Sequence, residues 1–306
     1  MKLKTNLSVL NWVILIFLVL TWGSSFILMK KGLEEYSYQQ VALLRLSVTC
    51  LVLLPFVIMS IKKVNLKKLG RMAIVGIIGN GIPAFLFTKA ETGIDSSLAG
   101  ILNSLTPLFT LIVGLSFFQS KTKWYNVLGV IIGLSGTVGL MSVSGNKNLE
   151  FNFSYGIYVI VATLLYAINL NFVKRHLKEV DAVTITSFAF LTIGIPALIY
   201  LFAATDFINV IQTRPNAYTG LGYIAILGIF GSAIAVILYN KLIKTSGVLF
   251  AASVTYLMPI VAVFWGIADG ERFELIYLLW IMIILLGVFM VNYVRNTKSI
   301  PEKSSQ

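Results

Sequence analysis

Charged residues are scarce in this chain, making up 12% of its 306 residues, against about 25% in a typical soluble domain. Hydrophobic residues make up 58%, and the mean hydropathy is +0.89. Apolar runs of about 20 residues recur along the chain, and each is long enough to cross a bilayer as a helix. The short alternating segments of a membrane β-barrel do not occur. The composition therefore predicts an all-α polytopic membrane protein.

The residues of reactive sites are also scarce. Cys50 is the single cysteine and lies inside an apolar run, which excludes an internal disulfide and a cysteine metal site. His176 is the single histidine and lies in a basic segment. No Ser-His-Asp set, H-E-x-x-H motif or glycine loop after a strand is present. A membrane enzyme acting on lipid would need a buried titratable cluster, so we expect no enzyme, no cofactor and no metal.

Acidic residues are missing from the interior of every apolar run. The nearest are Glu91, Asp95, Asp269 and Glu271, which lie in predicted outer loops. Proton-coupled carriers commonly relay protons through a buried carboxylate. The sequence therefore favours facilitated diffusion, or coupling through a site not visible in it, over a carboxylate-based antiporter.

Ten transmembrane helices are predicted from the apolar runs. They cover Leu10–Met29, Val41–Ser60, Met72–Thr88, Ser96–Phe118, Trp124–Ser142, Tyr155–Val173, Val183–Ala203, Tyr218–Asn240, Gly247–Ile267 and Leu275–Val294. The first run is too long for the apolar region of a signal peptide and is interpreted as a span. The polar tail, 297–306, is expected to be disordered.

Lys and Arg are distributed unequally between the connecting segments. With both termini in the cytoplasm, 17 lie in inner segments and 6 in outer ones. The six outer ones are Lys30, Lys31, Lys89, Lys147, Arg214 and Arg272. This positive-inside bias predicts cytoplasmic N- and C-termini. It also accounts for the net charge of +12 without any role in binding nucleic acid.

The chain contains an internal repeat. At a shift of 152 residues, Leu98–Gly114 aligns without a gap with Phe250–Gly266, so that Pro107 falls on Pro259. Earlier in the chain, at a shift of 144 residues, Trp22 falls on Tyr166. Five spans per repeat is an odd number, so the second copy must be inverted in the membrane. We predict two inverted five-helix repeats, residues 1–146 and 147–296.

Pro107 and Pro259 are predicted to kink their helices, since proline frees a backbone carbonyl that lipid cannot satisfy. Too many polar and aromatic residues lie near mid-span for all of them to face lipid. Any single one could serve only to bond a neighbouring helix. As a set they suit a cavity for a small amphipathic solute. The predicted substrate-binding residues are Trp22, Ser25, Arg45, Asn80, Asn103, Thr106, Tyr166, Asn169, Thr255 and Tyr256.

The sequence allows two interpretations of Arg45. It lies about two turns into the second span, within reach of the lipid headgroups. It could alternatively be a cavity charge that attracts a carboxylate. Lys89 and Lys241 occupy matching places in the repeats, and interfacial anchoring is favoured over a role as gates for an anion.

Span five carries small residues on one face, with a GxxxG step from Gly129 to Gly133. Such residues allow close helix packing, either within the fold or across a homodimer interface.

Several of these features together resemble a known family. They are Trp22-Gly23-Ser24-Ser25-Phe26, Arg45, the small-residue-then-proline pattern of spans four and nine, and ten spans in inverted halves. The chain resembles the EamA family of the drug/metabolite transporter superfamily, from about Val13 to Val294. The resemblance implies a bacterial inner-membrane carrier, usually an exporter of amino acids or other small metabolites. It also implies that spans one, three, four, six, eight and nine surround a cavity, while five and ten lie outside it.

The sequence thus predicts a secondary transporter that exports a small organic metabolite by alternating access. One alternative is an exchanger of anions or phosphorylated metabolites that uses Arg45, Lys89 and Lys241. A second is a non-transporting membrane sensor or partner protein, which would not need two inverted halves with matched prolines. The expected partners are a small-molecule substrate and the lipid bilayer, without nucleic acid.

Overall fold

The computed structural model describes residues 3–118, 124–143 and 149–292, with helices as the only regular elements in those ranges. Seven of the helical segments are long and apolar enough to cross a membrane. Three shorter apolar helices, Trp124–Leu140, Leu257–Ala268 and Leu275–Met290, overlap predicted spans five, nine and ten. The chain is therefore a polytopic helical membrane protein, while the count of ten spans stays a prediction. The predicted tail, 297–306, lies outside the described residues.

The helices follow one another with short connections. In the first half they are α1 (Leu3–Gly23), α2 (Ser25–Leu33), α3 (Tyr38–Ser60), η1 (Ile61–Lys63), α4 (Leu66–Gly76), η2 (Ile77–Gly81), α5 (Ile82–Ala90), α6 (Ser96–Asn103), α7 (Thr106–Phe118) and α8 (Trp124–Val143). In the second half they are α9 (Leu149–His176), α10 (Ala182–Ala204), α11 (Phe207–Thr213), α12 (Ala217–Ile226), η3 (Leu227–Ile234), α13 (Ala235–Ala268) and α14 (Leu275–Asn292).

Polar residues define where several helices begin. Ser37 and Gln40 form a reciprocal capping box at the start of α3. The Asn65 side chain accepts the backbone N–H of Lys68 at α4, and Asp181 accepts that of Thr184 at α10. Each cap satisfies a backbone donor that the first turn of a helix leaves free.

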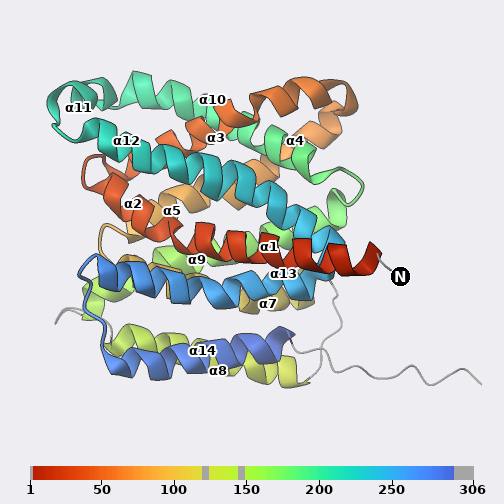
Figure 1. Cartoon of the computed structure of the whole chain (residues 1–306), viewed down its shortest axis with the longest axis vertical. Coiled ribbons are helices and arrows are strands. Elements are labelled where there is room, and N and C mark those ends of the chain that lie inside the picture. Colours follow the sequence, from red (N-terminus) through yellow and green to blue (C-terminus); the bar gives the residue numbers. More distant parts are fainter. Residues whose placement is uncertain (1–2, 119–123, 144–148, 293–306) are drawn as a thin grey trace, which may run out of the picture.

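The long helices lie side by side, with α3 and α10 packed together at one edge and α8 and α14 at the other (Figure 1). Between these pairs, α1 packs against α13 and α7 packs against α9. A continuous apolar core runs through the bundle and includes Leu18, Leu53, Leu105 and Phe190.

The predicted spans one and four are interrupted. A break at Ser24 separates α1 from α2, and a break at Ser104 and Leu105 separates α6 from α7. Pro107 is the second residue of α7 and so directly follows this break, where its missing N–H costs little. Pro259 lies inside α13.

Two wide helical turns occupy matching places in the chain. Predicted spans three and eight each contain a π-helical segment, η2 and η3 respectively. Such segments loosen the backbone hydrogen bonding and frequently occur at functional sites.

The predicted loop between spans eight and nine is helical in the structure. Helix α13 extends continuously from Ala235 to Ala268 and includes residues 241–246. Figure 1 nevertheless shows the chain reversing there, with the light-blue part reaching the right side and the darker part returning to the left. The two predicted spans are thus separate passes joined by helical turns.

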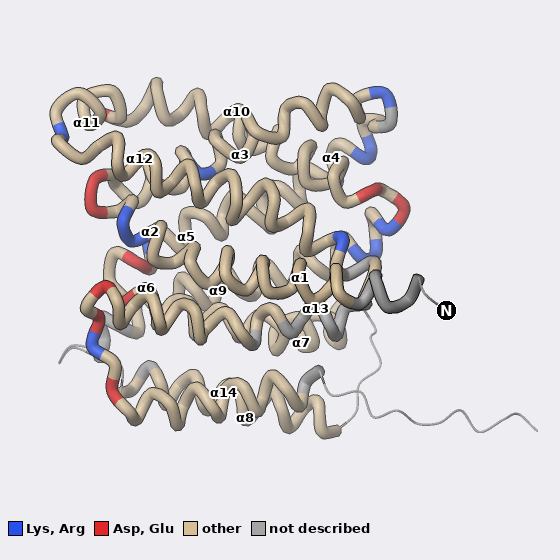
Figure 2. The backbone as a smooth tube through the Cα atoms, in the orientation of Figure 1, with Lys and Arg blue, Asp and Glu red and all other residues tan. Residues whose placement is uncertain are grey.

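Charged residues gather at the two ends of the bundle, with the helical bodies almost free of them (Figure 2). We call one end the acidic end, which includes Glu34, Glu91, Asp206 and Asp269, and the other the basic end, which includes Lys62, Lys67, Arg71 and Lys174. Under the positive-inside rule the basic end would face the cytoplasm, and this orientation stays a prediction.

Candidate functional site

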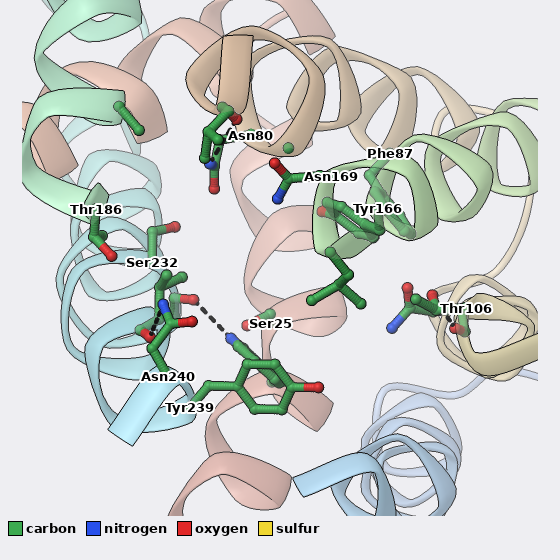
Figure 3. Close-up of a pocket in the computed structure, with 18 of the residues that line it drawn as sticks. Ser25, Asn80, Phe87, Thr106, Tyr166, Asn169, Thr186, Ser232, Tyr239 and Asn240 are labelled. Carbon is green, nitrogen blue, oxygen red and sulfur yellow. Dashed lines mark hydrogen bonds between the residues drawn. The ribbon is translucent and has the colours of Figure 1, made fainter. Parts of the chain in front are cut away.

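A cavity of about 210 Å³ lies among the central helices, and Figure 3 shows the side chains that point into it. It is lined by nine of the ten predicted binding residues: Trp22, Ser25, Arg45, Asn80, Asn103, Thr106, Tyr166, Asn169 and Thr255. The tenth, Tyr256, has a side chain outside the described residues. A volume of this order holds one small solute and is too small for a lipid or a peptide.

Both halves of the chain contribute to the walls. Trp22 and Ser25 flank the break between α1 and α2, and Asn80 comes from the π-helical η2. Asn103 and Thr106 flank the break between α6 and α7. Irregular helix termini leave backbone groups without helical partners, so the cavity is polar where the helices are interrupted.

Aromatic rings form two of the cavity walls. The Trp22 indole Nε1 donates to the Gly231 carbonyl oxygen of η3 at 2.9 Å, and its ring lies 5.0 Å from that of Tyr239. On the other side, Tyr166 of α9 stacks on Phe87 of α5, with ring centroids 5.9 Å apart. These contacts fix the rings and present apolar faces to a solute.

Two amide oxygens in the walls are left without a donor. Oδ1 of Asn103 and Oδ1 of Asn169 are buried and have no hydrogen-bond partner within the described residues. A buried acceptor without a donor is costly. These oxygens are therefore positioned to accept hydrogen bonds from a bound solute or from water.

Arg45 brings a positive charge into the cavity wall. Its Nε donates to the Ser232 hydroxyl of η3 at 2.9 Å, and it is the single charged side chain among the described lining residues. The structure thus places Arg45 in the cavity wall, where it bonds a neighbouring helix. A guanidinium here would bind a carboxylate through paired N–H donors.

The cavity ends toward the acidic end at an apolar layer made of Phe26, Phe87, Gly100 and Ala262. The Phe26 and Phe87 rings lie 6.1 Å apart, and both belong to the cavity wall. The Cα of Gly100 packs directly against Ala262 and the Phe26 ring, where a side chain would not fit. The backbones of α6 and α13 can therefore meet above the cavity.

An ionic layer lies beyond this apolar layer and is made of Lys30, Lys31, Ser96, Ser97, Asp269 and Glu271. Lys30 Nζ is 2.8 Å from Asp269 Oδ2 and 2.9 Å from Glu271 Oε1. Lys31 Nζ is 2.8 Å from Asp269 Oδ1. These pairs join α2 to the loop between α13 and α14.

Glu271 also holds the start of α6. Its carboxylate accepts the backbone N–H and the hydroxyl of both Ser96 and Ser97, at 2.6–3.1 Å. Burial alone would raise the pKa of Glu271, but hydrogen bonds from Ser97, Lys30 and Ser96 bring this pKa below its ordinary value. The carboxylate therefore stays ionised and ties α2, α6 and the α13–α14 loop together.

The basic end of the cavity is built differently. Its lining includes Val173 and Asn240, which directly precede Lys174 and Lys241 in the chain. All four ion pairs found between the described residues lie at the acidic end. The cavity thus extends toward the basic end and is separated from the acidic end by the apolar and ionic layers.

Several residues of the site were not predicted from the sequence. Three polar residues in the later part of predicted span eight also line the cavity: Ser232, Tyr239 and Asn240. They were not predicted because only polar residues near mid-span stand out in the sequence. Phe26 and Phe87 were missed because they look like ordinary core residues. Glu91 is buried although it lies past the end of α5. Across the described ranges no three His, Cys, Asp or Glu residues group into a metal site.

A polytopic helical bundle around a cavity with aromatic and polar walls, extending toward one end and closed toward the other, is the architecture expected of a membrane transporter. The comparison with protein families agrees. Residues 10–142 and 154–293 match the EamA-like transporter family. The chain belongs to this family, as the sequence resemblance predicted, and it is a transporter and not an enzyme.

Known relatives cover nearly the whole chain. An uncharacterized transporter of Archaeoglobus fulgidus is 27% identical over 283 residues, covering 92% of this chain and 98% of the relative. The uncharacterized inner membrane transporter YedA of Escherichia coli K12 is 27% identical over 282 residues, covering 90% and 88%. A solved crystal structure with 15% identity covers 92% of this chain and 95% of its own with a TM-score of 0.63, which shows a shared fold.

A more distant relative carries a more specific name. The "Probable terminal-alkyne amino-acid exporter" of Streptantibioticus cattleyicolor is 22% identical over 256 residues, covering 81% of each chain.

Proposed function

We propose that this protein is a secondary transporter of the cell inner membrane that exports amino acids or closely similar small metabolites by alternating access. One observation carries the substrate class. A single cavity combines one cation, Arg45, with two acceptor oxygens, on Asn103 and Asn169, that lack donors among the described residues. An α-amino acid offers a carboxylate for the first and an ammonium group for the second.

The cavity also suits an apolar side chain. The rings of Trp22, Tyr239, Phe87 and Tyr166 bound it on two sides. The amino-acid exporter of Streptantibioticus cattleyicolor supports the same class of solute, and the name of YedA supports the location.

Alternating access rests on two inverted repeats, 1–146 and 147–296, each with five spans. The two matched family segments fall on these repeats. Helix pairing supports the same internal symmetry, since α1 packs on α13 as α9 packs on α7, while α3–α10 and α8–α14 pair equivalent spans. In this arrangement one half can rock against the other around the cavity.

An exchanger of phosphorylated metabolites is the rival within transport. A phosphate dianion would call for more than one cation in a buried site, whereas Arg45 is the one cation among the described lining residues. Lys89 instead lies 4.7 Å from the Tyr38 ring centroid, and Lys241 is exposed.

The test is counterflow in proteoliposomes with three solutes of one shape: phenylalanine, its amide and 3-phenylpropionate, with glucose 6-phosphate as a fourth. We expect phenylalanine to exchange fastest. Arg45→Gln should remove the advantage of phenylalanine over its amide, because the amide has no carboxylate to lose. Arg214→Gln, an exposed arginine at the acidic end, is the matched control and should leave all rates unchanged. Equal rates for the acid and the amide in the wild type, or preference for the phosphate, would overturn the substrate assignment.

A further inference from the structure

Glu91 is a buried carboxyl group that neither the cavity nor the ionic layer uses. It directly follows α5 and is 8% exposed. Neither of its carboxyl oxygens has a hydrogen-bond partner within the described residues. An ionised carboxylate without donors is strongly disfavoured in such a place, whereas the neutral acid is tolerated.

Glu91 lies between the cavity and the ionic layer. Its backbone N–H donates to the carbonyl oxygen of Phe87 at 3.0 Å, so it stands one helical turn beyond a residue of the apolar layer. On α2, Lys30 likewise lies one helical turn beyond Phe26, four residues further toward the acidic end. Glu91 is therefore at the level where the acidic end would have to part for the cavity to open.

The charged groups that act on Glu91 are Lys30 of α2, Arg45 of α3 and Glu271 of the α13–α14 loop. Helix α9 also packs on α5, where Tyr166 stacks on Phe87 and Tyr155 lies against Gly93. Burial raises the pKa of Glu91 well above its ordinary value, and repulsion by Glu271 raises it further. Attraction to Lys30 and Arg45 opposes this shift only in part.

We propose that Glu91 is a proton-binding site that controls the acidic-end seal. It holds a proton while the two layers are closed, and its O–H bond breaks when they part, the proton passing to water on the acidic side. The inference rests on the alternating access of the proposed function, because it requires the acidic end to open.

The sign of the effect follows from linkage. The sealed state binds the proton more tightly than an open state with a solvated Glu91, so protons favour the seal and a rising pH at the acidic end favours opening. The opening equilibrium should rise by up to about tenfold per pH unit between the ordinary glutamate pKa and the raised one. Since the proton leaves to and returns from the same medium, this site regulates transport and does not energise it.

The experiment measures opening without knowledge of the substrate. Cys50 is the single cysteine, so Cys50→Ala gives a thiol-free background. Ala262→Cys then puts a thiol in the apolar layer, at a position that is 1% exposed in the sealed structure. A membrane-impermeant maleimide is added at the acidic end in right-side-out vesicles, between about pH 5 and about pH 8. Tyr218→Cys, an exposed position at the same end, reports insertion and the intrinsic pH dependence of the thiol.

The comparison is between Glu91→Gln, which is permanently neutral, and Glu274→Gln, an exposed glutamate at the same end. Relative to the Tyr218→Cys reference, labelling of Ala262→Cys should rise at least about tenfold across the range. Glu274→Gln should keep this rise, and Glu91→Gln should abolish it and label slowly throughout. A rise that persists in Glu91→Gln overturns the assignment of Glu91 and leaves the transporter intact. Absence of labelling in every variant, with the Tyr218→Cys reference labelled, overturns both this inference and alternating access.

Discussion

The two ends of the cavity differ in how they are closed. At the acidic end, α2, α6 and the α13–α14 loop meet in an apolar layer and an ionic layer, with Glu271 at the centre of the second. At the basic end, the lining reaches Val173 and Asn240, beside the charged residues that begin the connecting segments. The ion pairs found between the described residues therefore lie at the closed end of the cavity.

This difference between the two ends of the cavity indicates which conformational state the structure shows. If the basic end faces the cytoplasm, as the positive-inside bias predicts, the protein is in an inward-facing state with its outer side sealed. An exporter loads its substrate in this state. In the proposed alternating-access cycle, the contacts of the ionic layer would have to break and re-form each time the outer side opens.

The largest effect is expected from Glu271→Gln. The carboxylate accepts four hydrogen bonds from Ser96 and Ser97 and pairs with Lys30. Hydrogen bonds to charged groups contribute roughly 1.5–3 kcal/mol each, so the opening equilibrium should shift at least about 30-fold. The measurement is labelling of Ala262→Cys from the acidic side. Labelling no faster than in the Glu274→Gln control would mean that the ionic layer does not hold the seal.

A smaller loss is expected on the cavity side from Trp22→Ala. The change removes the hydrogen bond to the Gly231 carbonyl oxygen and the packing on Tyr239. We expect about a tenfold fall in phenylalanine counterflow, since a buried aromatic contact of this kind stabilises by about 0.5–1.5 kcal/mol beyond its buried area. Trp124→Ala, on an exposed side chain of α8, is the control and should transport normally. Unchanged flux in correctly inserted Trp22→Ala would show that this cavity wall is not needed for transport.

Asp269→Asn should open the seal less than Glu271→Gln does. Asp269 bridges Lys30 and Lys31, but its side chain is 17% exposed, against 3% for Glu271. Partly exposed ion pairs contribute about 0–1 kcal/mol, so a change of about threefold in Ala262→Cys labelling is expected. An effect equal to that of Glu271→Gln would show that burial does not determine which of the two carboxylates contributes more to the seal.

The pH dependence of the seal should have a minimum. Burial would raise the pKa of Asp269, but hydrogen bonds from Lys30 and Lys31 bring it below its ordinary value, and the pKa of Glu271 is lowered too. Their contribution to the seal is present above the ordinary carboxyl pKa and is lost as pH falls through the lowered values. Glu91 acts in the opposite sense as pH rises. Opening should therefore be least at mildly acidic pH on the acidic side. With labelling extended below about pH 4, a profile that keeps falling as the pH falls would contradict this.

Much of the site could be predicted because polar groups are energetically costly in lipid. Asn80, Asn103 and Asn169 stand out in apolar runs, and the structure places all three at one cavity. The repeat added Trp22 and Tyr166 as matched residues. The position of Arg45 could not be decided from its depth alone, because a snorkelling arginine and a cavity arginine share the same sequence context.

The seal was not predictable in the same way. Phe26 and Phe87 read as core residues, and only the approach of α6 to α13 at Gly100 makes them a closing layer. The sequence predicts Glu91 in a loop, and its burial could not be predicted because burial past the end of a helix depends on which neighbours cover it. The helical turns through residues 241–246 were not predicted, because polar residues there suggested a loop.

Alternating access requires the two ends of the cavity to open in turn. Thr186 is 3% exposed and lines the cavity near the basic end, so Thr186→Cys complements Ala262→Cys in the Cys50→Ala background. The measurement is labelling of each thiol from its own side, with and without Glu271→Gln. If opening alternates, Glu271→Gln speeds labelling of Ala262→Cys and slows labelling of Thr186→Cys. Faster labelling at both positions, or no change at Thr186→Cys, would contradict it.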